Sequence, residues 1–128
     1  MTKANILICD DERGIREALK LILERDYHLF YARNGKEAAL RVKTLKPDLL
    51  IMDIKMPFLN GLDALRVIRQ IDQRVPILII TGYESSDVAV QAVNLGANDY
   101  LTKPFEREEV TAKVQALLGL RGSACPSP

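Results

Sequence analysis

The sequence predicts an α/β fold in which an open, five-stranded parallel sheet is covered by helices on both faces. Two observations support this prediction. Short apolar runs alternate along the whole chain with segments of helical periodicity. The runs are rich in isoleucine and leucine and lack polar alternation, which is typical of strands buried on both faces of a parallel sheet. Right-handed crossovers between such strands place helices on both sides of the sheet.

The strands are expected at four clear apolar runs and one brief run. Periodicity alone does not separate such runs from fragments of buried helix, but their short length favours strands. The expected strands are Ile6–Cys9, the weaker Leu29–Ala32, Leu49–Met52, Ile77–Ile80 and the brief Asp99–Leu101.

Five helices are expected between and after these strands. In four of them the apolar residues recur at intervals of three and four, which gives one stripe facing the sheet. The remaining helix, from Val88 to Leu95, is apolar nearly all round. The four stripes are Ile15, Ala18, Leu19, Ile22 and Leu23; Ala38 and Val42; Ala64, Leu65, Ile68 and Ile71; and Val110, Val114, Leu117 and Leu118.

Helix boundaries carry the expected residue types. Asn34-Gly35 and Asn60-Gly61 stand at predicted helix starts, and Ser85-Ser86-Asp87 offers a side-chain N-cap. Gly96 and Gly119 follow predicted helix ends, where glycine is favoured.

Composition indicates a single ordinary globular domain. The chain has 128 residues, and 18 basic and 17 acidic side chains give a net charge of +1. This balance argues against direct nucleic-acid binding by the domain, because such binding needs a basic surface. We expect no membrane segment, since no apolar run approaches the ~20 residues of a membrane helix. We expect a cytoplasmic location, since Met1–Asn5 lack the apolar region of a signal peptide and the two cysteines form no disulfide framework. We assign residues 1–120 to the domain and 121–128 to a flexible linker or an added tail.

Polar residues follow four of the predicted strands. Asp10-Asp11-Glu12 comes after the first strand and Asp53 directly after the third. Thr81-Gly82 follows the fourth strand, and the fifth ends at Thr102-Lys103-Pro104. In an open parallel sheet, ligands bind beyond the carboxyl ends of the strands. We therefore expect three carboxylates, a hydroxyl and an ammonium at one edge, from Asp10, Asp11, Asp53, Thr81 and Lys103.

These groups together suit phosphoryl transfer. Taken singly, each also fits an ordinary helix start, turn or loop. Asp10, Asp11 and Asp53 would repel one another if all were ionised, and a divalent cation relieves this. Mg²⁺ prefers such oxygen ligands. Lys103 and Thr81 offer donors to phosphoryl oxygens, which completes a carboxylate nucleophile, a metal site and a cationic group.

In their order and spacing the motifs resemble the receiver domains of two-component response regulators, over about Ala4 to Leu118. The resemblance implies a flavodoxin-like receiver fold with strand order 2-1-3-4-5. It rests on Asp10-Asp11-Glu12, Asp53-Ile54-Lys55-Met56-Pro57, Asn60-Gly61, Thr81-Gly82 and residues 96–105, Gly-Ala-Asn-Asp-Tyr-Leu-Thr-Lys-Pro-Phe.

The resemblance also implies roles for individual residues. Asp53 would be the phosphoacceptor, and Asp11 would bind Mg²⁺ directly with Asp10 assisting. The backbone carbonyl of Lys55 would complete the protein ligands, and Lys103 would pair with the phosphoryl group.

Switching and partners follow from the same resemblance. Thr81 would bind the phosphoryl group and free space for Tyr100 to move from an exposed to a buried rotamer, and the peptide bond before Pro104 would be cis. A sensor histidine kinase would be the donor. The output would pass through the fourth helix, fifth strand and fifth helix. This face would act on a C-terminal effector domain or on a separate effector protein, or it would form a homodimer on phosphorylation. The whole protein would be a transcriptional regulator.

The resemblance implies a domain that is no enzyme beyond its own phosphotransfer and dephosphorylation. Three other classes of function fit the sequence less well. A haloacid-dehalogenase-like phosphatase carries Asp-x-Asp, whereas Asp53-Ile54-Lys55 lacks the second acid. A receiver that works without phosphorylation is disfavoured because every key position is filled. A flavodoxin-like electron carrier needs a phosphate-binding loop after the first strand, where this chain has acids.

Overall fold

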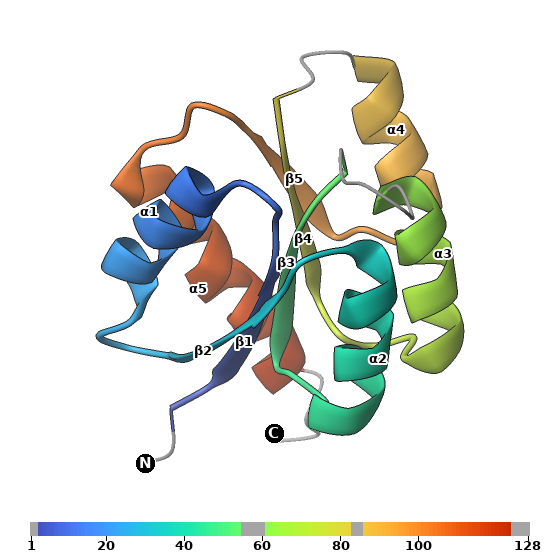
Figure 1. Cartoon of the computed structure of the whole chain (residues 1–128), viewed down its shortest axis with the longest axis horizontal. Helices are drawn as coiled ribbons and strands as arrows, with labels where there is room; N and C mark the ends of the chain where they lie inside the picture. The colour runs from blue at the N-terminus through green and yellow to red at the C-terminus, as the bar shows by residue number, and fades with distance from the viewer. Residues whose placement is uncertain (1–2, 55–60, 83–85, 124–128) are drawn as a thin grey trace.

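A computed structural model describes residues 3–54, 61–82 and 86–123. In these segments five strands and five helices alternate along the chain (Figure 1). The elements are β1 (Asn5–Cys9), α1 (Arg13–Leu23), β2 (His28–Ala32), α2 (Gly35–Leu45), β3 (Leu49–Asp53), α3 (Gly61–Ile71), β4 (Ile77–Thr81), α4 (Ser86–Asn94), β5 (Asp99–Thr102) and α5 (Arg107–Ser123).

The strands form one parallel sheet in the order β2-β1-β3-β4-β5. The predicted fold class and strand order are therefore confirmed. The order places β3 at the centre with β1 and β4 on its two sides, and β2 and β5 at the edges. The carboxyl ends of β1, β3, β4 and β5 consequently lie next to one another along one edge.

Each face of the sheet has its own apolar core. Residues alternate between faces along a strand, so Leu7 packs with α2, α3 and α4, whereas Ile8 packs with α1 and α5. Figure 1 shows α1 and α5 on one side of the sheet and α2, α3 and α4 on the other. The central strands are buried on both sides, which explains why their sequences are continuously apolar.

Two of the predicted helix boundaries are described in full. Asn34 is the N-cap of α2, where its Oδ1 accepts a hydrogen bond of 2.9 Å from the Glu37 amide. Gly96 follows α4 with a φ of 112°, a conformation that favours glycine. Helices α3 and α4 begin at Gly61 and Ser86, but Asn60 and Ser85 lie outside the described residues.

The expected helix end at Gly119 is wrong, because α5 continues to Ser123. A glycine inside a helix costs only about 1 kcal/mol relative to alanine. Neighbours with high helix propensity, such as Ala116 and Leu118, can offset that cost. The helix thus extends three residues beyond the expected domain boundary at residue 120. None of the helices in the described segments combines the length and apolar character needed to cross a bilayer.

Candidate functional site

Four strands deliver the candidate site residues to one edge of the sheet. Asp53 is the last residue of β3, and Thr81 is the last residue of β4. Asp10 directly follows β1, and Lys103 directly follows β5. The sheet is parallel, so these four positions meet at its carboxyl edge although they are spread over most of the chain.

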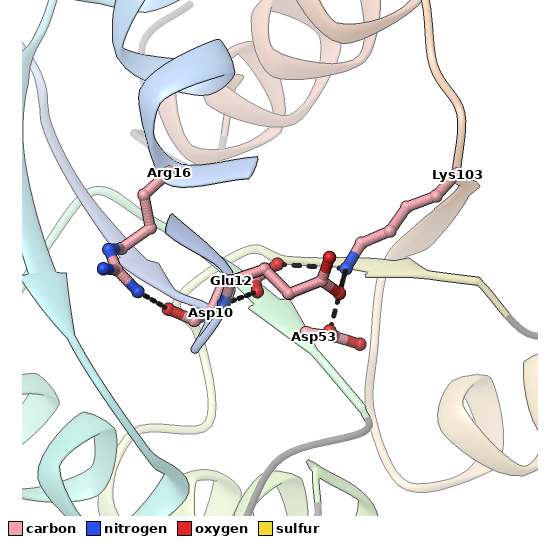
Figure 2. A network of polar contacts seen from close by, with 5 residues as sticks. All are labelled: Asp10, Glu12, Arg16, Asp53 and Lys103. Atoms are coloured by element: carbon pink, nitrogen blue, oxygen red, sulfur yellow. Dashed lines mark hydrogen bonds and ion pairs between the residues drawn. The ribbon is translucent and has the colours of Figure 1, made fainter. Parts of the chain in front are cut away.

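The ammonium group of Lys103 joins three carboxylates at this edge (Figure 2). Its Nζ lies 2.9 Å from Asp53 Oδ2 and 2.9 Å from Glu12 Oε1. It lies 3.3 Å from Asp10 Oδ2. The side chain of Lys103 is only 14% exposed, so its ion pairs with the buried Asp10 and Asp53 are shielded from bulk water, whereas Glu12 is 59% exposed.

The acidic groups of the site are buried to different degrees. Asp10 and Asp53 are 2% and 3% exposed, whereas Asp11 is exposed. Burying carboxylates is costly unless positive charge or hydrogen bonds compensate them. Lys103 provides this compensation between the ends of β1, β3 and β5.

Burial and charge perturb two groups in the site. Burial, followed by the nearby charge of Asp53, raises the pKa of Asp10, although the Glu12 amide and Lys103 oppose this rise. Burial alone would lower the pKa of Lys103. Its hydrogen bonds to Glu12 and Asp53 and the charges of Asp10 and Asp53 outweigh burial and raise the pKa, so the ammonium stays protonated.

Backbone contacts fix the position of Asp10 and Lys103. The Glu12 amide donates to Asp10 Oδ1 at 2.8 Å, and Arg16 Nη1 donates to the Asp10 carbonyl at 2.8 Å. The Lys103 amide donates to the Thr81 carbonyl at 2.9 Å. The sequence analysis predicted no contact of Glu12 or Arg16 with these site residues. Glu12 belonged to the acidic triplet, but no sequence signal pointed to Arg16.

Asp10, Asp11 and Asp53 form a cluster that suits a divalent cation. One carboxylate oxygen from each lies within 4.8 Å of the others. Burial, and after it the charge of Asp53, raises the pKa of Asp10, and a bound cation would favour the ionised carboxylate. Oxygen donors of this kind match the ligand preference of Mg²⁺. The predicted ligand Lys55 lies outside the described residues.

The predicted switch residues lie in and beside the site. Thr81 is 3% exposed, whereas Tyr100, in β5, is 42% exposed. The β4–β5 register pairs Thr81 with Thr102 and Ile79 with Tyr100. The Lys103–Pro104 peptide bond is cis.

Comparison with known proteins assigns the chain to a class. The site is a carboxylate–lysine cluster at the carboxyl edge of a doubly wound parallel sheet, an arrangement suited to accepting a phosphoryl group. Residues 6–115 match the family model described as the response regulator receiver domain. The chain therefore belongs to the family of response regulator receiver domains, and its role is that of a phosphoacceptor signalling domain.

Similar sequences include two full-length regulators. The chain is 40% identical over 123 residues to the alkaline phosphatase synthesis transcriptional regulatory protein PhoP of Bacillus subtilis (strain 168), covering 95% of this chain and 51% of that protein. It is 40% identical over 114 residues to the response regulator MprA of Mycobacterium avium (strain 104), covering 88% of this chain and 50% of that protein. The chain thus spans about half the length of these relatives.

Similar solved structures include two receiver domains. The response regulator domain of Thermotoga maritima CheB superposes with a TM-score of 0.84 at 28% identity, covering 92% of this chain and 98% of that chain. The receiver domain of sensor histidine kinase PA1611 from Pseudomonas aeruginosa PAO1 gives a TM-score of 0.85 at 28% identity, covering 92% and 99%. That structure has a magnesium ion coordinated in its active-site cleft.

Proposed function

We propose that Asp53 is the phosphoacceptor and that it takes its phosphoryl group from a phosphohistidine of a sensor histidine kinase. The contact that carries this proposal is the 2.9 Å distance from Lys103 Nζ to Asp53 Oδ2. A buried carboxylate is held beside a protonated ammonium at the edge of the sheet where ligands bind. The ammonium can pair with a phosphoryl oxygen once the carboxylate carries the group.

The transfer is a displacement at phosphorus. A carboxylate oxygen of Asp53 forms a bond to phosphorus while the bond from phosphorus to the donor imidazole nitrogen breaks. The nitrogen keeps the electron pair, and Asp53 becomes an acyl phosphate. Water later attacks phosphorus, the bond to Asp53 breaks, and the products are the free carboxylate and inorganic phosphate. The domain thus acts on its own phosphoryl group and is not an enzyme with a separate substrate.

A magnesium ion would occupy the acidic cluster. Asp11, Asp10 and Asp53 would supply carboxylate oxygens, together with the carbonyl of Lys55. When bound, Mg²⁺ supplies positive charge beside the phosphoryl oxygens. The spacing of the three carboxylates and the magnesium ion in the PA1611 receiver support this assignment.

The output would pass from the phosphoryl group through Thr81 to Tyr100. It would alter the face formed by α4, β5 and α5, and reach a C-terminal effector domain, a separate effector or a second phosphorylated copy. We infer that the chain is part of a transcriptional regulator, because PhoP is described as a transcriptional regulatory protein and the chain spans about half of it. The exposed Tyr100 supports this route, since a buried ring could not move inward.

Intact-mass measurement tests the acceptor. With Mg²⁺ and a small phosphodonor such as acetyl phosphate, the wild-type chain should gain one phosphoryl group and Asp53→Asn should gain none. Omitting Mg²⁺ should slow the wild-type reaction strongly. Equal labelling of Asp53→Asn would place the acceptor at another residue and overturn the proposal.

A further inference from the structure

An arginine of α3 reaches across to the connection between α4 and β5. The Nε and Nη2 atoms of Arg69 donate to the Gly96 carbonyl at 3.0 Å and 2.8 Å. Its Nη1 donates to the Asp72 carbonyl at 3.1 Å, which ties the guanidinium to the end of its own helix. Burial lowers the pKa of Arg69, although Asp72 opposes this, and the guanidinium remains charged.

Asn98 extends this contact to the sheet. Its Oδ1 accepts hydrogen bonds from Arg69 Nη2 at 3.0 Å and from the Ile77 amide at 2.8 Å. The backbone amide of Asn98 donates in turn to the Ile77 carbonyl at 2.9 Å. One guanidinium therefore links α3, the α4–β5 connection and, through Asn98, the start of β4.

The backbone at Gly96 packs directly on Arg69. A Cβ atom at Gly96 would lie 2.9 Å from Arg69 Cγ and 2.9 Å from Nε, so a larger residue does not fit without a shift. Backbone hydrogen bonds from the Gly96 and Ala97 amides to the Val93 and Ala92 carbonyls close the end of α4. The positive charge also lies where the negative end of the helix dipole favours it.

This contact and the phosphoacceptor site lie at opposite ends of β4. Ile77 begins β4, whereas Thr81 ends it at the proposed site. The start of α4 at Ser86 follows Thr81 closely in the chain, and its end lies beside α3 (Figure 1). The hydrogen bonds from Arg69 to Gly96 and Asn98 are thus made at the end of α4 that is remote from the site.

We propose that Arg69 holds the C-terminal end of α4 as a fixed pivot, so that rearrangement of α4 during switching is confined to the end that follows Thr81. Arg69 is a positioning residue in this device and makes no contact with the phosphoryl group. The switching part rests on the proposed function. We call the hydrogen bonds from Arg69 to Gly96 and Asn98 the clamp. The clamp is present in the unphosphorylated domain and can be tested separately.

Hydrogen exchange of the unphosphorylated domain tests the clamp. Arg69→Gln removes the charge and the forked donor, and Arg66→Gln is the matched control, because Arg66 is 63% exposed and lies 4.0 Å from Asp63 within the same helix. In Arg69→Gln, protection of the amides of residues 96–98 should fall at least about tenfold more than protection of Leu7 and Ile51 in the central strands. Arg66→Gln should leave this ratio unchanged. An equal fall at all these amides would mean a merely structural role and overturn the clamp.

Beryllofluoride with Mg²⁺, which stands in for the phosphoryl group, tests the pivot. In wild type, NMR shift changes should lie in the N-terminal part of α4 and stop before Ala92, whose carbonyl accepts from the Ala97 amide. In Arg69→Gln they should extend through residues 92–98. An identical pattern in both proteins would overturn the pivot. If wild type showed no change at Asp53 or Thr81, the proposed phosphoacceptor role would fail, while the exchange experiment would still decide the clamp.

Discussion

Lys103 Nζ lies 2.9 Å from Asp53 Oδ2, although 50 residues separate the two in the chain. Glu12 and Asp10 contact the same ammonium, so one cation serves three carboxylates. The charge balance at this edge of the sheet therefore depends on Lys103 more than on any single acid. This dependence leads to the first prediction.

Replacing Lys103 with methionine should destabilise the domain in the absence of metal. The substitution keeps much of the side-chain volume but leaves Asp10 and Asp53 buried without their cation. Breaking a buried ion pair on one side costs about 3 kcal/mol or more. Urea denaturation should show this loss, and millimolar Mg²⁺ should restore part of it by supplying positive charge at the same carboxylates.

Lys113→Met is the matched control for this loss. Its Nζ also makes a 2.9 Å ion pair, with Asp99, but both side chains are about one-third exposed. Exposed pairs contribute at most about 1 kcal/mol. If the two lysine variants lost equal stability, burial of the site carboxylates would not be the reason for the effect.

Asp10→Asn should raise the stability of the metal-free domain at neutral pH. The pKa of Asp10 is raised in the folded state, chiefly by burial, so the folded protein holds this proton more tightly than the unfolded chain. That contribution is present below the ordinary pKa of 3.8 and is lost as the pH rises through the raised value. Asparagine keeps an oxygen for the Glu12 amide and removes the buried charge, while Lys103 keeps Asp53 and Glu12 as partners, so the variant should be the more stable protein.

Thermal melts from pH 4 to pH 7 check this sign. The advantage of Asp10→Asn over wild type should grow as the pH rises, and Mg²⁺ should stabilise the variant less than wild type. Asp11→Asn should change the metal-free melting temperature less, because Asp11 is exposed, but should also weaken the Mg²⁺ response. A constant difference between Asp10→Asn and wild type across this range would contradict the assignment to Asp10 ionisation.

Asn34→Ala should destabilise the domain without changing its site chemistry. The Asn34 side chain caps α2 at 2.9 Å from the Glu37 amide, and Glu37 Oε1 accepts from the Arg33 amide at 3.2 Å. Loss of such a cap costs about 1 kcal/mol. Urea denaturation measures this loss, and Asn34→Asp, which retains a cap acceptor, should recover most of it. A full loss in Asn34→Asp would mean that capping is not the cause.

The fold was predictable because the strands that form both cores are short, uninterrupted apolar runs in the sequence. The Ile77–Ile80 run has no polar position, and only a strand with helices on both faces buries all four side chains. Boundaries were less certain where local preference and packing compete. Gly119 is such a case, because the rest of the last helix overrides the stop signal.

The site was predictable where a residue ends a strand or directly follows it. Asp10, Asp53, Thr81 and Lys103 meet because parallel strands share a carboxyl edge. The clamp formed by Arg69 was not predictable. It joins a helical residue to a carbonyl 27 positions away, and only the packing of α3 against α4 brings the two together.

Thr81→Ala should separate phosphorylation from the distant response. Thr81 is buried at the end of β4 and contributes a hydroxyl and no carboxylate, so Asp53 should still be phosphorylated in the variant. In wild type, beryllofluoride with Mg²⁺ should change the NMR chemical shifts of Asp53, Thr81 and Tyr100. The phosphoryl analogue draws the Thr81 hydroxyl inward and biases a pre-existing equilibrium between two conformations. The variant lacks this hydroxyl and should show the local shifts with much weaker changes at Tyr100. Thr102→Ala, its register partner on β5, is the control and should retain the full response. A complete response at Tyr100 in Thr81→Ala would show that the signal reaches β5 by a route that does not use the hydroxyl.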